Sequence, residues 1–140
     1  MASPGRQIVI LVVDDEVIVR NIVQRILIRE GFAVLSAADG QEALELLETF
    51  PDTIELLLTD IEMPRLDGLN LARQVRGKNG KIKIMFMSGK LADNQAEPIN
   101  FISKPFQPRA LLIRVHETLS DLLSVKSTPP DASSDAELLS

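Results

Sequence analysis

The sequence predicts an α/β domain built as a doubly wound, five-stranded parallel sheet. Short apolar runs rich in β-branched residues alternate with stretches whose apolar residues recur at helical spacing, and most of these segments end at a Gly, a Pro or a charged residue. Strands that alternate with helices favour a parallel sheet with right-handed crossovers. A chain of 140 residues, 45 % of them hydrophobic, is long enough to bury one core. We therefore expect one domain.

The first half of the chain contains two predicted strands, each followed by a predicted helix. Residues 7–13 form a nearly continuous β-branched run, as expected of a strand buried on both faces. Apolar residues then recur at helical spacing until Gly31, a natural helix stop. Residues 32–37 give a second short strand, and a second apolar stripe at helical spacing is closed by Pro51.

The second half continues the same alternation. Residues 54–59 form a third strand that runs directly into Asp60, and a helix over residues 69–76 follows. Two further strands are predicted over residues 82–87 and 99–103. Pro108 then suits the first position of a last helix, because its missing N–H would be unpaired there anyway.

Composition sets the domain boundaries and narrows the function. Residues 1–6 lack the apolar core of a signal peptide and are expected as an N-terminal extension, with the domain over residues 7–124. Residues 125–140 are rich in Ser, Pro, Asp and Glu and are expected as a flexible C-terminal tail. No apolar run approaches a membrane span, and the absence of Cys excludes disulfides and thiolate metal sites. A cytoplasmic protein follows as the expectation.

The net charge of −5 argues against direct binding of nucleic acid. The function is better indicated by five polar residues, each at the end of a predicted strand. They are Asp14, Asp15, Asp60, Ser88 and Lys104. In an open parallel sheet the carboxyl ends of the strands meet at one edge, where ligands bind. Three close carboxylates favour a divalent cation, while a hydroxyl and an ammonium remain to hold an anion. This combination predicts a pocket that binds magnesium and accepts phosphate.

The same residues lie in a set of short motifs. These motifs occupy residues 12–16, 59–64, 67–68, 87–89 and 104–106. Each motif alone is a weak indicator of a protein family, but their order and their placement at strand ends are together specific. With them, residues 7–124 resemble the receiver domain of two-component response regulators. The resemblance implies a flavodoxin-like fold and a phosphoprotein in phosphorelay signal transduction.

The resemblance also implies the role of each acid. Asp60 becomes the phosphoacceptor, receiving its phosphoryl group from a sensor histidine kinase or a histidine phosphotransfer protein. Asp15, Asp60 and the backbone carbonyl of Glu62 would bind Mg²⁺ directly, and Asp14 would act through a metal-bound water. Self-phosphorylation and autodephosphorylation would then be its only chemistry, so the chain is not expected to be an enzyme.

The remaining motif residues imply how the phosphoryl group is bound and read out. Lys104, expected before a cis-proline bond, and the Ser88 hydroxyl would contact the phosphoryl oxygens. Ser88 would move toward the phosphate, and Phe101 would swing into the space that it leaves. Glu62 and Lys90 occupy positions that tune the attack of water on the aspartyl phosphate. The output would be recognised by a downstream protein target.

One segment departs from the family pattern. The chain between Ser88 and Lys104 is shorter than expected for the family, and residues 90–98 have room for only about two helical turns before Pro98. We therefore expect the fourth helix to be shortened or missing. That change would alter the usual output face, and homodimerisation is left open.

Some residues have ordinary structural interpretations. Asp14 and Asp15 sit where acids cap a helix, although capping needs only one of them. Phe101 could be a simple core residue. Glu16 could be a cap, a neighbour of the site, or neither. His116 lies on the last helix, away from the strand ends, and is excluded as a phosphorelay histidine.

Other functional classes fit less well. A haloacid dehalogenase-type phosphatase needs an Asp two residues after its nucleophile, where this chain has Glu62. A flavin-binding protein needs a phosphate-cradling loop after the first strand, where Asp14 and Asp15 would repel phosphate. A degenerate receiver used only for binding is disfavoured by the intact Asp60 and Lys104. The chain is expected either as a stand-alone receiver or as one from a larger protein such as a hybrid kinase.

Overall fold

The predicted apolar runs form five parallel strands, and the stretches between them form helices. The computed structural model describes residues 7–89 and 100–127. The strands are β1 (Val9–Val13), β2 (Ala33–Ala37), β3 (Ile54–Asp60), β4 (Lys83–Ser88) and β5 (Phe101–Ser103). The helices are α1 (Val17–Arg29), α2 (Gly40–Thr49), α3 (Gly68–Lys78) and α4 (Pro108–Ser127).

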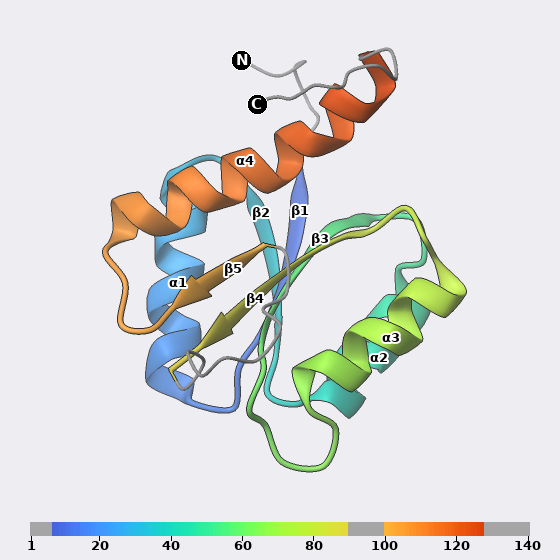
Figure 1. Cartoon of the computed structure of the whole chain (residues 1–140). Helices are drawn as coiled ribbons and strands as arrows, with labels where there is room; N and C mark the ends of the chain where they lie inside the picture. The colour runs from blue at the N-terminus through green and yellow to red at the C-terminus, as the bar shows by residue number, and fades with distance from the viewer. Residues whose placement is uncertain (1–6, 90–99, 128–140) are drawn as a thin grey trace, which may run out of the picture.

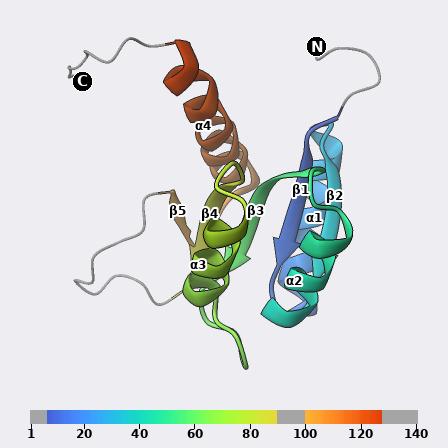
Figure 2. The same cartoon turned by 90° about the vertical axis from the view of Figure 1, so that its right-hand side faces the viewer.

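The sheet has the order β2-β1-β3-β4-β5, and every neighbouring pair is parallel. Helices α1 and α4 cover one face, and α2 and α3 cover the other, as Figure 1 shows and the side view in Figure 2 confirms. The direction in which strands are added reverses between β1 and β3. Such a reversal opens a crevice at the carboxyl ends of the two strands, which is where ligands bind in sheets of this kind.

The core consists of two apolar layers because the sheet is buried on both faces. Alternate residues of β1 divide between them: Ile10 and Val12 pack with α1 and α4, whereas Leu11 and Val13 pack with α2 and α3. All four of these side chains are fully buried. This burial explains why β1 is a continuous apolar run rather than an alternating one.

Helix boundaries follow local chemistry. Helix α1 ends before Gly31, whose φ of 105° is one that L side chains rarely adopt. Helix α2 begins with a reciprocal cap, in which Asp39 Oδ1 accepts from the Glu42 amide (2.9 Å) and Glu42 Oε1 accepts from the Ala38 amide (2.8 Å). Asp67 caps α3 by accepting from the Asn70 amide at 2.8 Å. These caps fix the loops at the carboxyl edge of the sheet.

The observed bounds differ from the predicted ones by one to a few residues. Strand β1 begins at Val9 rather than at residue 7, and α3 extends the expected 69–76 at both ends. Helix α4 begins at Pro108 as expected and runs to Ser127, beyond the boundary expected at residue 124. The shortened or missing fourth helix, the extension over residues 1–6 and the rest of the tail lie outside the described residues. Among the described helices, none has the length and apolarity needed to cross a membrane.

Candidate functional site at the carboxyl edge

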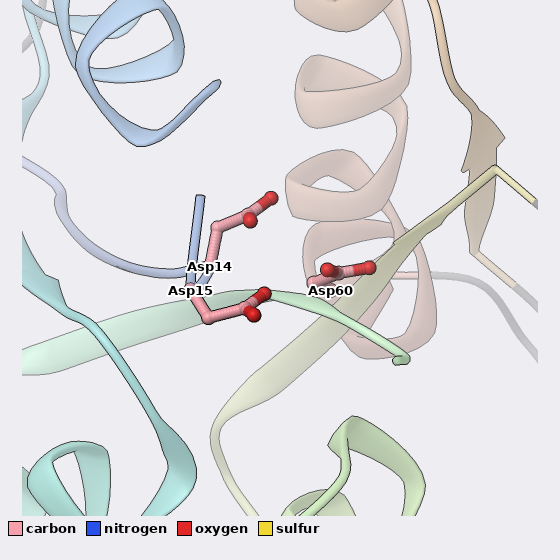
Figure 3. Close-up of side chains that lie close together, drawn as sticks. All are labelled: Asp14, Asp15 and Asp60. Carbon is pink, nitrogen blue, oxygen red and sulfur yellow. The ribbon is translucent and has the colours of Figure 1, made fainter. Parts of the chain in front are cut away.

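Strands β1 and β3 bring three carboxylates together at the sheet edge. Val13 pairs with Thr59, so the next residues, Asp14 just after β1 and Asp60 at the end of β3, lie side by side. Asp15 follows Asp14, and Figure 3 shows the three side chains close together. Oxygens from the three carboxylates lie within 4.8 Å of one another. The convergence predicted from the strand ends is present in the structure.

The burial of these acids differs. Asp14 is fully buried and Asp60 is 3 % exposed, whereas Asp15 faces solvent. Buried carboxylates need compensation, because burial disfavours their charged form. A neighbouring cation supplies part of it here.

Lys104 provides that compensation from the strand at the far edge of the sheet. Its Nζ donates to Asp14 Oδ2 at 2.9 Å and lies 3.3 Å from Asp60 Oδ2. Glu16, which sequence left open, lies at the rim with its Oε1 3.6 Å from the same Nζ. The Lys104–Pro105 bond is cis, as predicted. One ammonium therefore bridges the acids of β1 and β3.

The protonation of the pocket reflects this balance. Burial raises the pKa of Asp60 to about 6, and the charge of Asp14 adds to the rise while Lys104 opposes it. For Lys104, burial opposes the charged form, but the hydrogen bond and charge of Asp14, together with Asp60, outweigh it and raise its pKa. Asp60 is therefore mostly ionised at pH 7, and Lys104 stays charged.

The unpaired atom of the pocket is on Asp60. Its Oδ1 is buried and has no hydrogen-bond partner among the described residues. Buried carboxylate oxygens are normally paired, so an unpaired one beside two further acids fits a missing ligand. Mg²⁺ prefers oxygen ligands, including one or two carboxylates, and the donor set here matches that preference.

Ser88 ends β4, one residue beyond the strand partner of Asp60, and has a partner that sequence did not indicate. The residue is fully buried at the strand end, and its Oγ donates to Glu62 Oε2 at 2.9 Å, with Oε1 at 3.1 Å. Sequence assigned Glu62 only a backbone carbonyl and a tuning role. Its side-chain contact depends on the path of the β3–α3 loop, and no local motif encodes it.

That loop is held by contacts on both sides of Glu62. The Ile61 amide donates to Met87 O and its carbonyl accepts from the Gly68 amide, both at 2.9 Å. At Gly68 a Cβ would collide with the carbonyl of Asp60, so only glycine fits there. The loop therefore starts from a fixed backbone position.

A clamp between Asp39 and Arg65 holds the far end of the loop. Arg65 has a φ of 67°, and its guanidinium donates to Asp39 Oδ2 at 2.7 Å. The Glu42 amide and the Arg65 guanidinium hold the pKa of Asp39 below its usual range. Leu66 lies against Gly40, where an added Cβ would meet its side chain and carbonyl. The clamp ties the loop to the start of α2.

Asp14 and Asp15, which follow β1, could have served only to cap helix α1, but the contacts in the structure do not support that interpretation. Asp14 Oδ1 accepts from the Glu16 amide at 2.9 Å, but α1 has no side-chain cap at its N-cap residue, Glu16. Instead, the Arg20 guanidinium donates to the Asp14 carbonyl at 2.7 Å and ties the loop to the first turn of the helix. Asp14 therefore faces both its own loop and Lys104.

Of the other residues singled out by sequence, Lys90 lies outside the described residues, and Phe101 and His116 lie apart from the acids. Phe101 begins β5 opposite Phe86 of β4, is half-buried, and packs against the α2–α3 side of the core. His116 lies on α4 with its Nε2 2.8 Å from Glu30 Oε2 and its ring against Phe32. His116 is thus a helix-packing residue outside the pocket.

The chain is similar in sequence and fold to known proteins. Residues 10–116 match the family described as response regulator receiver domain. The aerobic respiration control protein ArcA of Escherichia coli (strain K12) is 36 % identical over 124 residues, which cover 83 % of this chain and 50 % of ArcA. The sensor kinase CckA of Brucella abortus (strain 2308) is 35 % identical over 116 residues, covering 79 % of this chain and 12 % of the kinase.

A solved structure agrees with the sequence relatives. The crystal structure of the receiver domain from hybrid histidine kinase CckA superposes with a TM-score of 0.70 at 40 % identity, covering 79 % of this chain and 98 % of that one. The chain spans about half the length of ArcA and a smaller share of the CckA kinase. The family match covers most of the described residues, including the strand ends that carry Asp14, Asp60 and Lys104. The chain belongs to the response regulator receiver domains of two-component systems.

Proposed function

We propose that this chain is a cytoplasmic, phosphorylation-dependent switch that accepts a phosphoryl group on Asp60. Receiver domains take their phosphoryl groups from histidine kinases, and the donor here would be the phosphohistidine of such a kinase or of a histidine phosphotransfer protein. The observation that carries the proposal is the buried Asp60 carboxylate between two further acids and Lys104. Asp15, beside these buried groups, is exposed to solvent.

The residues of the pocket divide the work. Asp14, Asp15 and Asp60, with the backbone carbonyl of Glu62, would hold Mg²⁺, Asp14 acting through a water. The ion would supply positive charge that offsets the carboxylates and the phosphoryl oxygens. A carboxylate is a weak nucleophile, and this neutralisation together with alignment lets it react.

In the transfer step an Asp60 oxygen forms a bond to phosphorus while the bond from phosphorus to the histidine nitrogen breaks. Lys104 then pairs with a phosphoryl oxygen, and the Ser88 hydroxyl donates to another. Phe101 fills the space vacated by Ser88, which changes the surface presented to a downstream protein. Hydrolysis of the aspartyl phosphate resets the switch, so the chain acts on itself and not as an enzyme on other substrates.

Intact-mass measurement after incubation with Mg²⁺ and a small phosphodonor tests the proposal. We expect one phosphoryl adduct that requires the metal and is absent from Asp60→Asn. Asp52→Asn, an exposed acid outside the pocket, is the matched control and should retain the adduct. An adduct that persists in Asp60→Asn, or that forms equally without a divalent cation, would contradict the assignment.

A further inference from the structure

The side chain of Glu62 has a contact that the proposed function does not use. Its carboxylate accepts from the Ser88 hydroxyl at 2.9 Å through Oε2, with Oε1 at 3.1 Å. Ser88 is fully buried, whereas Glu62 is exposed. A hydrogen bond to a charged acceptor is among the stronger ones that a hydroxyl makes. The contact therefore holds Ser88 in one arrangement.

The backbone makes this contact local and specific. Glu62 directly follows Ile61, whose amide and carbonyl are both hydrogen-bonded, to Met87 and Gly68. Ser88 directly follows Met87, and its own carbonyl accepts from the Lys104 amide at 2.9 Å. Both ends of the side-chain bond thus start from anchored backbone, and only the Glu62 side chain has room to withdraw toward solvent.

A hydroxyl carries one proton, so Ser88 donates fully to one acceptor at a time. A phosphoryl group on Asp60 is an anionic oxygen acceptor, as the Glu62 carboxylate is. The charge of Glu62 already reaches Asp60, since it is among the charges that disfavour ionisation of that carboxyl. Glu62 therefore opposes the phosphoryl group both by occupying the donor and by like charge.

We infer that Glu62 is a positioning residue that holds the Ser88 hydroxyl in the unphosphorylated chain and competes with the phosphoryl group for it. The inference rests on the proposed function and adds to it an internal competitor that keeps the unphosphorylated state favoured. Switching exchanges one anionic acceptor for another, and Glu62 swings outward as it loses Ser88.

The contact itself is tested first, without metal or phosphodonor. The ¹³C shift of the Glu62 side-chain carboxyl is measured in the natural chain and in Ser88→Ala. We expect a clear shift change at Glu62 and none at Glu45, an exposed acid on α2. An unchanged Glu62 signal would overturn the inference regardless of whether Asp60 is phosphorylated.

The competition is tested with beryllofluoride, a phosphoryl analogue, in the presence of Mg²⁺. Glu62→Ala should raise the affinity for the analogue about tenfold, which corresponds to about 1.4 kcal/mol, whereas Glu45→Ala should leave it unchanged. In the Ser88→Ala background the gain from Glu62→Ala should shrink severalfold, because the shared donor is gone. An equal gain in both backgrounds would show an effect of charge alone and overturn the inference.

Two conservative variants separate charge from hydrogen bonding. Glu62→Asp keeps the charge but shortens the side chain, so it should release Ser88 and still raise the affinity severalfold. Glu62→Gln keeps an acceptor of the same length and should give a smaller gain than Glu62→Ala. A loss of affinity in Glu62→Asp would contradict the competition. Failure of the natural chain to bind the analogue, with the Ser88-dependent shift intact, would instead count against the proposed function on which the competition depends.

Discussion

The two halves of the pocket are built in different ways. The acidic half consists of Asp14, Asp15 and Asp60 at the ends of the central strands β1 and β3, with Lys104 reaching them from the end of the edge strand β5. Its adjoining loop is tied down by backbone hydrogen bonds. The β4–β5 half consists of Ser88, which ends β4, and Phe101, which begins β5, an edge strand of three residues. There the hydrogen bond from Ser88 to Glu62 and the half-buried ring of Phe101 contribute to the arrangement. The proposed switch would use this asymmetry, with a preformed half that binds the ligand and a half that changes its packing.

The largest expected effect on stability comes from a substitution at Gly68, which packs against the backbone of the acidic half. Gly68→Ala places a Cβ against the Asp60 carbonyl, so we expect a loss of about 3 kcal/mol in the free energy of unfolding, the upper end for overpacking. Gly77→Ala is the matched control, because that helical position has no neighbour within 4 Å. It should gain about 0.5–1 kcal/mol from helix propensity. Urea denaturation measures both, and similar values for the two variants would contradict a closely packed loop.

The next largest effect on the free energy of unfolding concerns the buried, charged carboxylate of Asp60. The pKa of Asp60 is raised from 3.8 to about 6, so between pH 4 and 6 the folded chain keeps a proton that the unfolded chain has lost. The contribution of Asp60 to stability therefore falls as pH rises through that window and stays low above it. Removing the carboxylate with Asp60→Asn should stabilise the metal-free chain at pH 7 by on the order of 2 kcal/mol, and much less at pH 4.

Mg²⁺ provides the complement to that experiment. At pH 7 the ion should raise the free energy of unfolding of the natural chain by mass action, and raise that of Asp60→Asn less. Urea denaturation at pH 4 and 7, with and without the ion, measures these differences. A stability difference between the natural chain and Asp60→Asn that is the same at both pH values would show that burial does not raise the pKa of this carboxyl.

The smallest effect sharpens the description of the β4–β5 half. Phe101 is half-buried, whereas Phe86, its partner across the strand pair, is 5 % exposed. We expect Phe101→Leu to cost under about 0.5 kcal/mol and Phe86→Leu about 1–1.5 kcal/mol. Thermal unfolding of the two variants measures the gap. Equal losses would mean that Phe101 is packed as a core residue, which is the plainer interpretation of its sequence position.

Sequence predicts well the residues whose positions are determined by the end of a strand. Parallel strands bring their carboxyl ends to one edge, so residues far apart in the chain, such as Asp14 and Lys104, could be placed together from the apolar runs before them. Element types could be predicted for the same reason, because buried strands and amphipathic helices leave distinct periods.

The parts that sequence did not predict depend on the path of a loop. The bond from Ser88 to Glu62 and the clamp from Arg65 to Asp39 each join residues 26 positions apart through irregular backbone. Glu62 and Arg65 belong to no periodic pattern of apolar residues. The positive φ of Arg65 is also not indicated by its residue type. The caps at Asp39 and Asp67 did have a local signal, because each lies three residues before the amide that it binds.

The Asp39 carboxylate links the loop that carries Arg65 to an amide that NMR can observe. One of its oxygens binds the Glu42 amide and the other binds Arg65, so the two contacts share a single rigid planar group. Because Arg65 lies on the same loop as Glu62, we expect a change in the path of that loop to alter the hydrogen bond between Asp39 and the Glu42 amide. The ¹H–¹⁵N resonance of the Glu42 amide is then expected to report a change in the pocket from the start of α2, without any label placed in the pocket itself.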